Sequence, residues 1–315
     1  MPSDGAKRTT VYAALGLRKG VSELLWAYRK KYSLEEFPAY LDDHPLPILT
    51  RVEQEIKNDM KTADIVIAPH YLLLMMKKRG LLGTYRSAEL SAFPPWAQDT
   101  SWVGIGVTTM FPAYNTSLAR GTLPKDFDDL FRRYSKKDIA SQAFTTSSAG
   151  NLTTLYFAAL RRVVGDRVWE SMMDKISGEK QPEIYDCIDH LLQAVARGDH
   201  SVAMTVYSLA YERMREEKAP ISQLAIPELP VLWTLTSVGL IKGAENRLPP
   251  RHFIDFLLSG EGQQKLGKIR GITPSRSDLL QGSGLSLDPS RFFPLATEVD
   301  QMPNMTKKLA RMGLK

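Results

Sequence analysis

The sequence of 315 residues is poor in cysteine, in long apolar runs and in the short motifs of common catalytic sites. Its one cysteine, Cys187, excludes disulfides within the chain and any site made of several thiolates. No apolar run approaches the roughly 20 residues that cross a bilayer. With 43% hydrophobic residues, we expect a folded, soluble protein of about two domains.

Motifs of enzymes and of nucleic-acid-binding proteins are also missing. The sequence has no HExxH, GxSxG, Walker or CxxC motif, and its five histidines show no metal-ligand spacing. We therefore expect no enzymatic activity, no cofactor and no resident metal. The net charge is +6, but lysine and arginine alternate with acidic residues instead of forming one stripe. This pattern argues against nucleic-acid binding and favours a weak general attraction for anions.

Short apolar strands alternate with amphipathic helices in the first hundred residues. The patterns predict strands at 9–14 and 64–68, and helices at 21–32, 48–56 and 71–78. Helices between short apolar strands are typical of an α/β fold with a mainly parallel sheet. Ligands of such sheets bind beyond the carboxyl ends of the strands. Gly16, Arg18 and His70 follow two of these ends and are candidate binding residues.

Small hydroxyl residues and a glycine fill positions 145–150, directly before an apolar helix pattern. We expect Ser147 or Ser148 to cap this helix, whose N-terminus carries unpaired N–H groups and a partial positive charge. The two hydroxyls, together with the N–H groups of Ala149 and Gly150, predict an anion-binding site. A capping role without a ligand is the alternative interpretation.

Two longer β stretches, 102–110 and 233–241, differ from the short strands and could cross between two lobes. A further strand at 201–206 ends at Tyr207 and Ser208, which places two hydroxyl groups at a strand end. Additional helices are predicted at 123–131, 152–163, 191–197, 251–258 and 262–269.

The order and spacing of these features resemble the extracellular solute-binding proteins of family one. These are receptors of bacterial ABC importers and include ferric-iron and phosphonate binders. The most specific stretch is Phe253 to Gln263, and the resemblance also rests on residues 113–116, 123–130, 147–150 and 239–244. It covers nearly the whole chain. It implies an α/β type II periplasmic-binding-protein fold, in which two lobes with mixed, mostly parallel sheets flanked by helices are joined by two crossing strands.

The resemblance also implies an organisation, a location and partners. One lobe would comprise residues 8–103 plus 240–275, the second 110–232, and residues 276–315 would form a C-terminal helical segment packing on the lobes. The protein would be a monomer in the periplasm or at the cell surface and would pass solute to an ABC transporter permease. The amino terminus shows no apolar leader, so a cytoplasmic protein or a chain whose leader has been removed both fit. A sensor for a membrane kinase and a cytoplasmic effector are alternatives.

The resemblance offers two classes of solute. Ferric members hold Fe(III) with two adjacent tyrosines, a histidine and a carboxylate, aided by a synergistic anion. Here Tyr207 is followed by Ser208, so the second tyrosine is missing. Iron binding by Tyr207 and His70 is therefore the alternative, and Tyr211 is expected to pack within the following helix.

The predicted solute is a phosphonate, a phosphate ester or a carboxylate, held in the interlobe cleft by hinge closure. Its proposed anchors are the anion loop (Ser147, Ser148, Ala149, Gly150), the strand end of one lobe (Tyr207, Ser208) and residues of the other lobe (Gly16, Arg18, His70).

Overall fold

The computed structural model describes residues 8–14, 18–119, 121–134, 136–142, 151–177 and 182–312. The chain forms two compact units: unit 1 is Met1–Val107 with Leu235–Ser286, and unit 2 is Thr108–Thr234 with Leu287–Lys315. Two long strands, β4 (Val103–Asn115) and β9 (Leu232–Leu240), each have residues in both units, as predicted for the crossing segments. Among the described residues, no helix combines the length and the apolar character that spanning a bilayer requires.

The sheet of unit 1 has the strand order β2-β1-β3-β9. Its strands are β1 (Thr10–Ala13), β2 (Ala39–Asp42) and β3 (Ile65–Pro69), which are parallel, and β9, which is antiparallel to β3. A two-residue strand, β10 (Thr273–Pro274), pairs with β4. Because β1 and β3 are parallel neighbours, their carboxyl ends lie at the same edge of the sheet.

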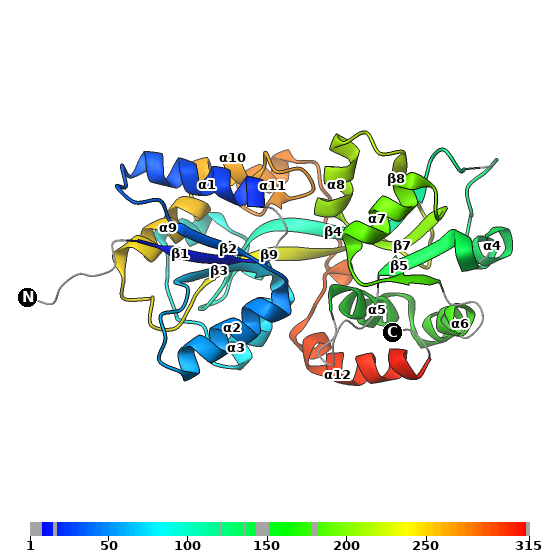
Figure 1. The fold of residues 1–315 in the computed structure, drawn as a ribbon, viewed down its shortest axis with the longest axis horizontal. Helices are drawn as coiled ribbons and strands as arrows, with labels where there is room; N and C mark the ends of the chain where they lie inside the picture. The colour runs from blue at the N-terminus through cyan, green and yellow to red at the C-terminus, as the bar shows by residue number, and fades with distance from the viewer. Residues whose placement is uncertain are drawn as a thin grey trace, which may run out of the picture. The chain divides into compact units, whose positions relative to one another are not determined.

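Helices cover both faces of this sheet (Figure 1). They are α1 (Arg18–Lys31), α2 (Pro45–Lys57), α3 (His70–Lys78), α9 (Leu248–Leu258), α10 (Gly260–Leu266) and α11 (Ser277–Gly282). Helices α1 and α10 lie on one face, and α2 and α3 on the other. The Tyr28 ring of α1 contacts the Phe253 and Phe256 rings of α9, with centroids 4.9 and 5.7 Å apart. The FIDFLLSGEGQ stretch thus supplies core residues of unit 1.

The sheet of unit 2 has the order β4-β7-β5-β6. Its parallel strands are β5 (Ile139–Gln142), β6 (Glu183–Tyr185) and β7 (Val202–Tyr207), and β4 is antiparallel to β7 and to β8 (Ile221–Gln223). Parallel strands flanked by antiparallel ones in each unit match the predicted mixed, mostly parallel α/β class.

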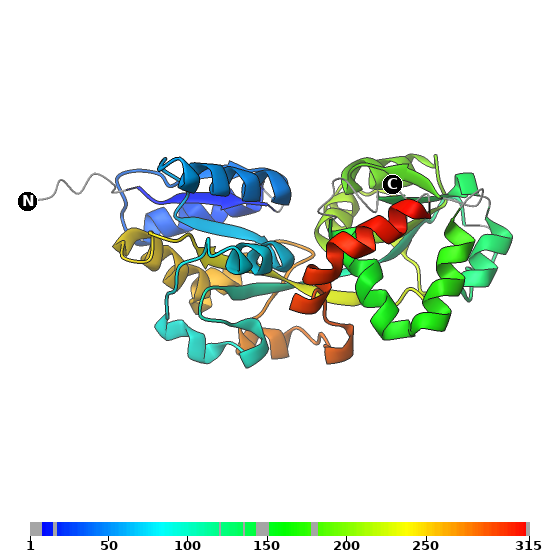
Figure 2. The ribbon, with the colours of Figure 1, turned by 90° about the horizontal axis from the view of Figure 1, so that it is seen from below.

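The helices of unit 2 pack on its sheet and on one another. They are α4 (Phe127–Arg133), α5 (Leu152–Val164), α6 (Asp166–Ile176), α7 (Ile188–Arg197), α8 (Ser208–Glu216) and α12 (Ala296–Arg311). Figure 2 shows α12 (red) against α5 (green), where Arg162 and Glu298 form an ion pair of 2.9 Å.

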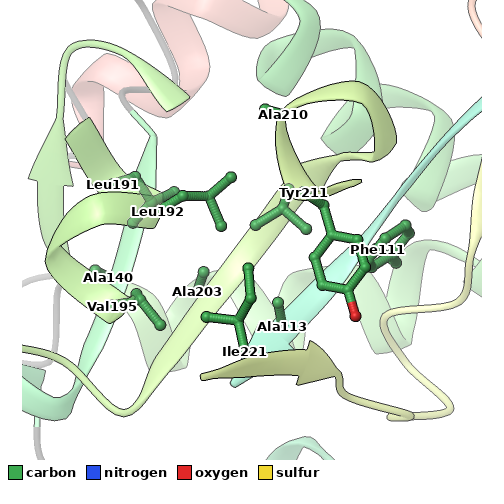
Figure 3. Close-up of a cluster of buried hydrophobic side chains, with 11 residues drawn as sticks. Phe111, Ala113, Ala140, Leu191, Leu192, Val195, Ala203, Ala210, Tyr211 and Ile221 are labelled. Carbon is green, nitrogen blue, oxygen red and sulfur yellow. The ribbon is translucent and has the colours of Figure 1, made fainter. Parts of the chain in front are cut away.

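A buried apolar cluster fixes α7 and α8 on the sheet of unit 2 (Figure 3). Leu191, Leu192 and Val195 of α7 pack there, and all three side chains are fully buried. The Tyr211 ring of α8 meets the Phe111 ring of β4 edge-on, with centroids 5.1 Å apart. The prediction that Tyr211 packs within its helix is therefore confirmed.

Most predicted elements are present, but helix α4 is shorter than predicted. The helix predicted over 123–131, with Pro124 in its first turn, begins at Phe127. The reason is a cap: the Asp126 side chain accepts a hydrogen bond of 2.7 Å from the Asp129 N–H. In contrast, α7 ends as predicted at Gly198, whose φ of 89° suits a residue without a side chain.

Candidate functional site

The junction between β7 and α8 holds two hydroxyl residues in place. The Tyr207 hydroxyl donates to Thr108 Oγ1 at 3.1 Å, and the Thr109 N–H donates to Ser208 Oγ at 3.1 Å. Both partners belong to β4, because the antiparallel register sets Met110 opposite Tyr207. Tyr207 is 9% exposed and Ser208 is 7% exposed. The predicted pair is thus at a strand end, as expected, and is anchored to the neighbouring strand.

The predicted anion loop follows the strand next to β7. Strand β5 is parallel to β7, with Ala140 paired to Ala203, so the carboxyl ends of both strands lie at the same edge. Ser147, Ser148, Ala149 and Gly150 lie outside the described residues. The described chain resumes at Asn151, before α5.

Asn151, and neither Ser147 nor Ser148, caps helix α5. The Asn151 side chain accepts a hydrogen bond of 3.0 Å from the Thr154 N–H, and the Thr154 hydroxyl accepts one of 3.4 Å from the Asn151 N–H. This reciprocal pair is a capping box, so the predicted serine cap is wrong. The sequence signal for this capping box was an asparagine directly before the apolar pattern, with a hydroxyl residue three positions later.

His70 is the first residue of α3, directly after β3, and it is only 3% exposed. Its Nδ1 lies 3.0 Å from the Ser237 hydroxyl of β9, and its ring meets the Trp102 ring edge-on at 4.3 Å. His70 is therefore a buried helix residue, although a lone histidine after a strand is more often expected at the surface or in a loop. The reason is the antiparallel pairing of β3 with β9, which encloses the junction.

Burial also sets the charge of His70. Loss of solvent lowers its pKa from 6.5 to about 3, although the negative charge of Asp99 acts in the opposite direction. The imidazole is therefore neutral near pH 7. The ring can therefore form hydrogen bonds but carries no positive charge.

The other two candidates of unit 1 follow β1 in the sequence. Gly16 lies outside the described residues. Arg18 begins α1, but its side chain lies outside the described part of the structure. Because β1 and β3 are parallel, with Tyr12 paired to Val66, the end of β1 and His70 lie at the same edge of unit 1.

The hydrogen-bond partners of these residues were not predicted from the sequence. About a hundred residues separate Tyr207 and Ser208 from their partners on β4. His70 is further still in sequence from its partner, Ser237 of β9. No local pattern identifies such a partner, because the strand register decides which hydroxyl meets which side chain.

Comparison with known proteins assigns the family. The sequence profile of bacterial extracellular solute-binding proteins matches residues 96–268, just over half of the chain. No curated protein matches the chain.

Solved structures give the fold. The ferric binding protein from Campylobacter jejuni has a TM-score of 0.77 at 17% identity, over 98% of this chain and 100% of that chain. AfuA from Actinobacillus pleuropneumoniae, a periplasmic binding protein with fructose-6-phosphate bound, has 0.74 at 17%, over 97% and 98%. Iron-bound HitA from Pseudomonas aeruginosa has 0.73 at 16%, over 96% and 99%. These likenesses confirm the predicted fold class, and with the profile they lead to one conclusion: the chain belongs to the family of bacterial extracellular solute-binding proteins.

Proposed function

We propose that this protein is the solute receptor of a bacterial ABC importer, in the periplasm or at the cell surface, and that it binds a small anionic solute as a monomer. Family membership supports the receptor role. The net charge of +6 supports an anionic solute. A permease in the membrane would receive the solute, so the protein itself would carry out no chemistry.

The observation that carries this proposal is the polar carboxyl edge of unit 2. Tyr207 and Ser208 end β7, and the serine- and glycine-rich stretch 145–150 follows the parallel neighbour β5. Hydroxyl groups and backbone N–H groups at such an edge suit the oxygens of a phosphonate, a phosphate ester or a carboxylate. In this proposal Ser147, Ser148 and the N–H groups of 149 and 150 anchor the anion.

Tyr207 and Ser208 would contribute as hydrogen-bonding groups already held in place. The phenol proton of Tyr207 points to Thr108, which is 1% exposed. An anionic oxygen would compete for this proton, and a bond to a charged acceptor is stronger than one to a neutral hydroxyl. Since both side chains are already fixed by β4, little rotamer freedom remains to be lost on binding.

Unit 1 would supply Gly16, Arg18 and His70. Arg18 is at the start of α1, where its guanidinium could bind an anion through two parallel hydrogen bonds. His70 would act as a neutral hydrogen-bonding group. Closure of the two lobes on the solute is implied by the family resemblance, and small-angle scattering with and without solute measures it.

Ferric iron is the second candidate, because two of the similar structures are ferric-binding or iron-bound proteins. Tyr207 would be the phenolate ligand and His70 a nitrogen ligand, with a synergistic anion. The position after Tyr207 is a serine, and the Tyr207 hydroxyl is engaged with Thr108. A site with a single phenolate suits Fe(III) less well than it suits an anionic solute.

The experiment has two steps. Native mass spectrometry of the protein as purified, and again after unfolding and dialysis, identifies any small molecule retained. A thermal-shift panel of sugar phosphates, phosphonates, carboxylates and Fe(III) then identifies what raises the melting temperature, since a ligand of the native state stabilises it by mass action. Protection by Fe(III) alone, with a tyrosinate charge-transfer colour, would reverse the order of the two candidates.

Variants locate the site. We expect the double variant Tyr207→Phe, Ser208→Ala to weaken binding of the protecting anion at least tenfold, about 1.4 kcal/mol. Tyr211→Phe is the matched control, because it removes a phenol hydroxyl from α8, the helix that follows Tyr207, outside the proposed site. Ser148→Glu should abolish protection through repulsion of the anion. Unchanged protection would remove Ser148 from the site.

A further inference from the structure

Three side chains with metal-binding chemistry meet where β6 passes into α7. They are Asp186, Cys187 and His190, and one ligand atom of each lies within 4.8 Å of the other two. The His190 Nδ1 is 3.2 Å from the Asp186 Oδ1. This group was not predicted from the sequence, because common metal motifs repeat cysteine or histidine and this set mixes three residue types.

The start of α7 explains why these side chains converge. Cys187 is the N-cap residue, with extended backbone angles (φ −137°, ψ 154°), and His190 is the third residue of the helix. Side chains at the N-cap and at the third helical position face each other across the first turn, as in a capping box. Leu191, Leu192 and Val195 hold the apolar face of α7 on the sheet (Figure 3), while His190 remains exposed.

We propose that Asp186, Cys187 and His190 bind one divalent transition-metal ion of the zinc class, with a fourth coordination position open to water or another oxygen ligand. A thiolate, an imidazole and a carboxylate are the three ligand types that zinc takes in proteins. Calcium and magnesium prefer oxygen ligands, so this set discriminates against them.

The geometry needs only small rotamer changes. Ligand bonds of about 2.0–2.3 Å in a tetrahedron place the ligand atoms roughly 3.3–3.8 Å apart. The present separations of up to 4.8 Å are therefore close to this range. The side chains of Asp186 and His190 are 83% and 63% exposed, so both can move and an ion can reach them without unfolding.

Two polar side chains among the described residues near the site, Asp189 and His200, are already engaged and would not complete the coordination. The Asp189 carboxylate forms an ion pair with Arg213 of α8. His200 lies 2.7 Å from the Tyr185 hydroxyl and 2.6 Å from the Lys137 carbonyl oxygen. Within the described part of the chain the proposed site has three protein ligands, which is the number typical of open zinc sites.

Strand register places this site at the polar edge of unit 2. Ala140 of β5 pairs with both Glu183 of β6 and Ala203 of β7, and all three strands are parallel. The carboxyl ends of β6 and β7 therefore lie at the same edge, two strand spacings or roughly 10 Å apart. The proposed metal site thus shares an edge with the proposed solute residues and uses different side chains, so either proposal can fail without the other.

Cobalt(II) titration of the reduced full chain tests the proposal. Cys187 is the only cysteine, so any thiolate-to-cobalt charge-transfer absorption must come from it. We expect this band to saturate at one cobalt per monomer, to disappear on addition of zinc, and to be absent in Cys187→Ser. His190→Gln and Asp186→Asn should each weaken cobalt binding at least tenfold.

His252→Gln is the matched control, because it removes another exposed histidine, on α9 of unit 1. It should bind cobalt like the unchanged protein. Melting temperatures of all variants without metal show whether they fold. Absence of the band at saturating cobalt would overturn the proposal. Unchanged affinity in folded His190→Gln would also overturn it, since the cysteine would then bind cobalt without this neighbour. One cobalt shared by two chains in sedimentation would overturn it as well, because the ligands would then come from two molecules.

Discussion

In both units, side chains at a strand-to-helix junction are hydrogen-bonded to a neighbouring antiparallel strand. In unit 1, His70 after β3 contacts the Ser237 hydroxyl of β9. In unit 2, Tyr207 and Ser208 after β7 are bonded to residues of β4. In both units the partner belongs to a long antiparallel strand that has residues in the two units. These two strands therefore do more than connect the units, because they also fix the polar residues at each edge.

The two junctions differ in what burial does to the polar group. Trp102 and β9 enclose the imidazole of His70, and the loss of solvent keeps it neutral. The junction of unit 2 uses hydroxyl groups, which carry no charge to lose. A buried ionisable group makes its unit sensitive to acid, whereas hydroxyl groups do not.

The largest expected difference between the units is in their response to acid. The unfolded chain protonates His70 below about pH 6.5, but the folded chain protonates it only near pH 3. Unfolded chains thus bind more protons in this window, and the free energy of unfolding of unit 1 should fall by about 1.4 kcal/mol per pH unit as the pH is lowered.

His70→Asn is the control for this effect, because an amide can still bond to Ser237 but does not titrate. Urea unfolding at pH values from 7 to 4 measures the free energy of unfolding of the unchanged protein and of the variant. Hydrogen exchange then shows which unit loses stability. Equal slopes for the unchanged protein and the variant would show that His70 is not the source of the acid sensitivity.

A smaller difference is expected when the hydroxyl partner is removed from each junction. Ser237→Ala takes a partner from an imidazole that is 3% exposed, and we expect a loss of about 1–3 kcal/mol. Ser208→Ala takes an acceptor from the half-buried Thr109 N–H, and we expect about 0.5–1.5 kcal/mol. Chemical denaturation at pH 7 gives both values. A larger loss for Ser208→Ala would contradict the view that unit 1 has the more enclosed junction.

The smallest expected effect concerns the helix starts. Helix α5 has a side-chain cap from Asn151, whereas α3 starts after Pro69 without one. Asn151→Ala should cost about 1 kcal/mol. Asn151→Asp is the control, since aspartate caps equally well and should keep the stability. If alanine costs nothing in thermal unfolding, the capping box does not stabilise unit 2.

The sequence allowed prediction of the elements with strong periodicity. Strands β1 and β3, helices α3 and α7, and both long strands were expected from apolar patterns and glycine stops. Strand β6 was not predicted, because three strand residues leave little pattern to recognise. Helix α6 was also missed, although its buried residues Trp169, Met172, Met173 and Ile176 follow a helical spacing.

The sequence by itself determined the α/β class, the family resemblance and the hydroxyl pair at the end of β7. These depend on local periodicity and on residue order, which a linear chain displays directly. The tertiary structure alone decided that His70 is buried and neutral, that β4 holds Tyr207 and Ser208, and that β6 and β7 end at the same edge of unit 2. Each of these depends on which strands become neighbours and in what register, and register is set by packing of the whole sheet.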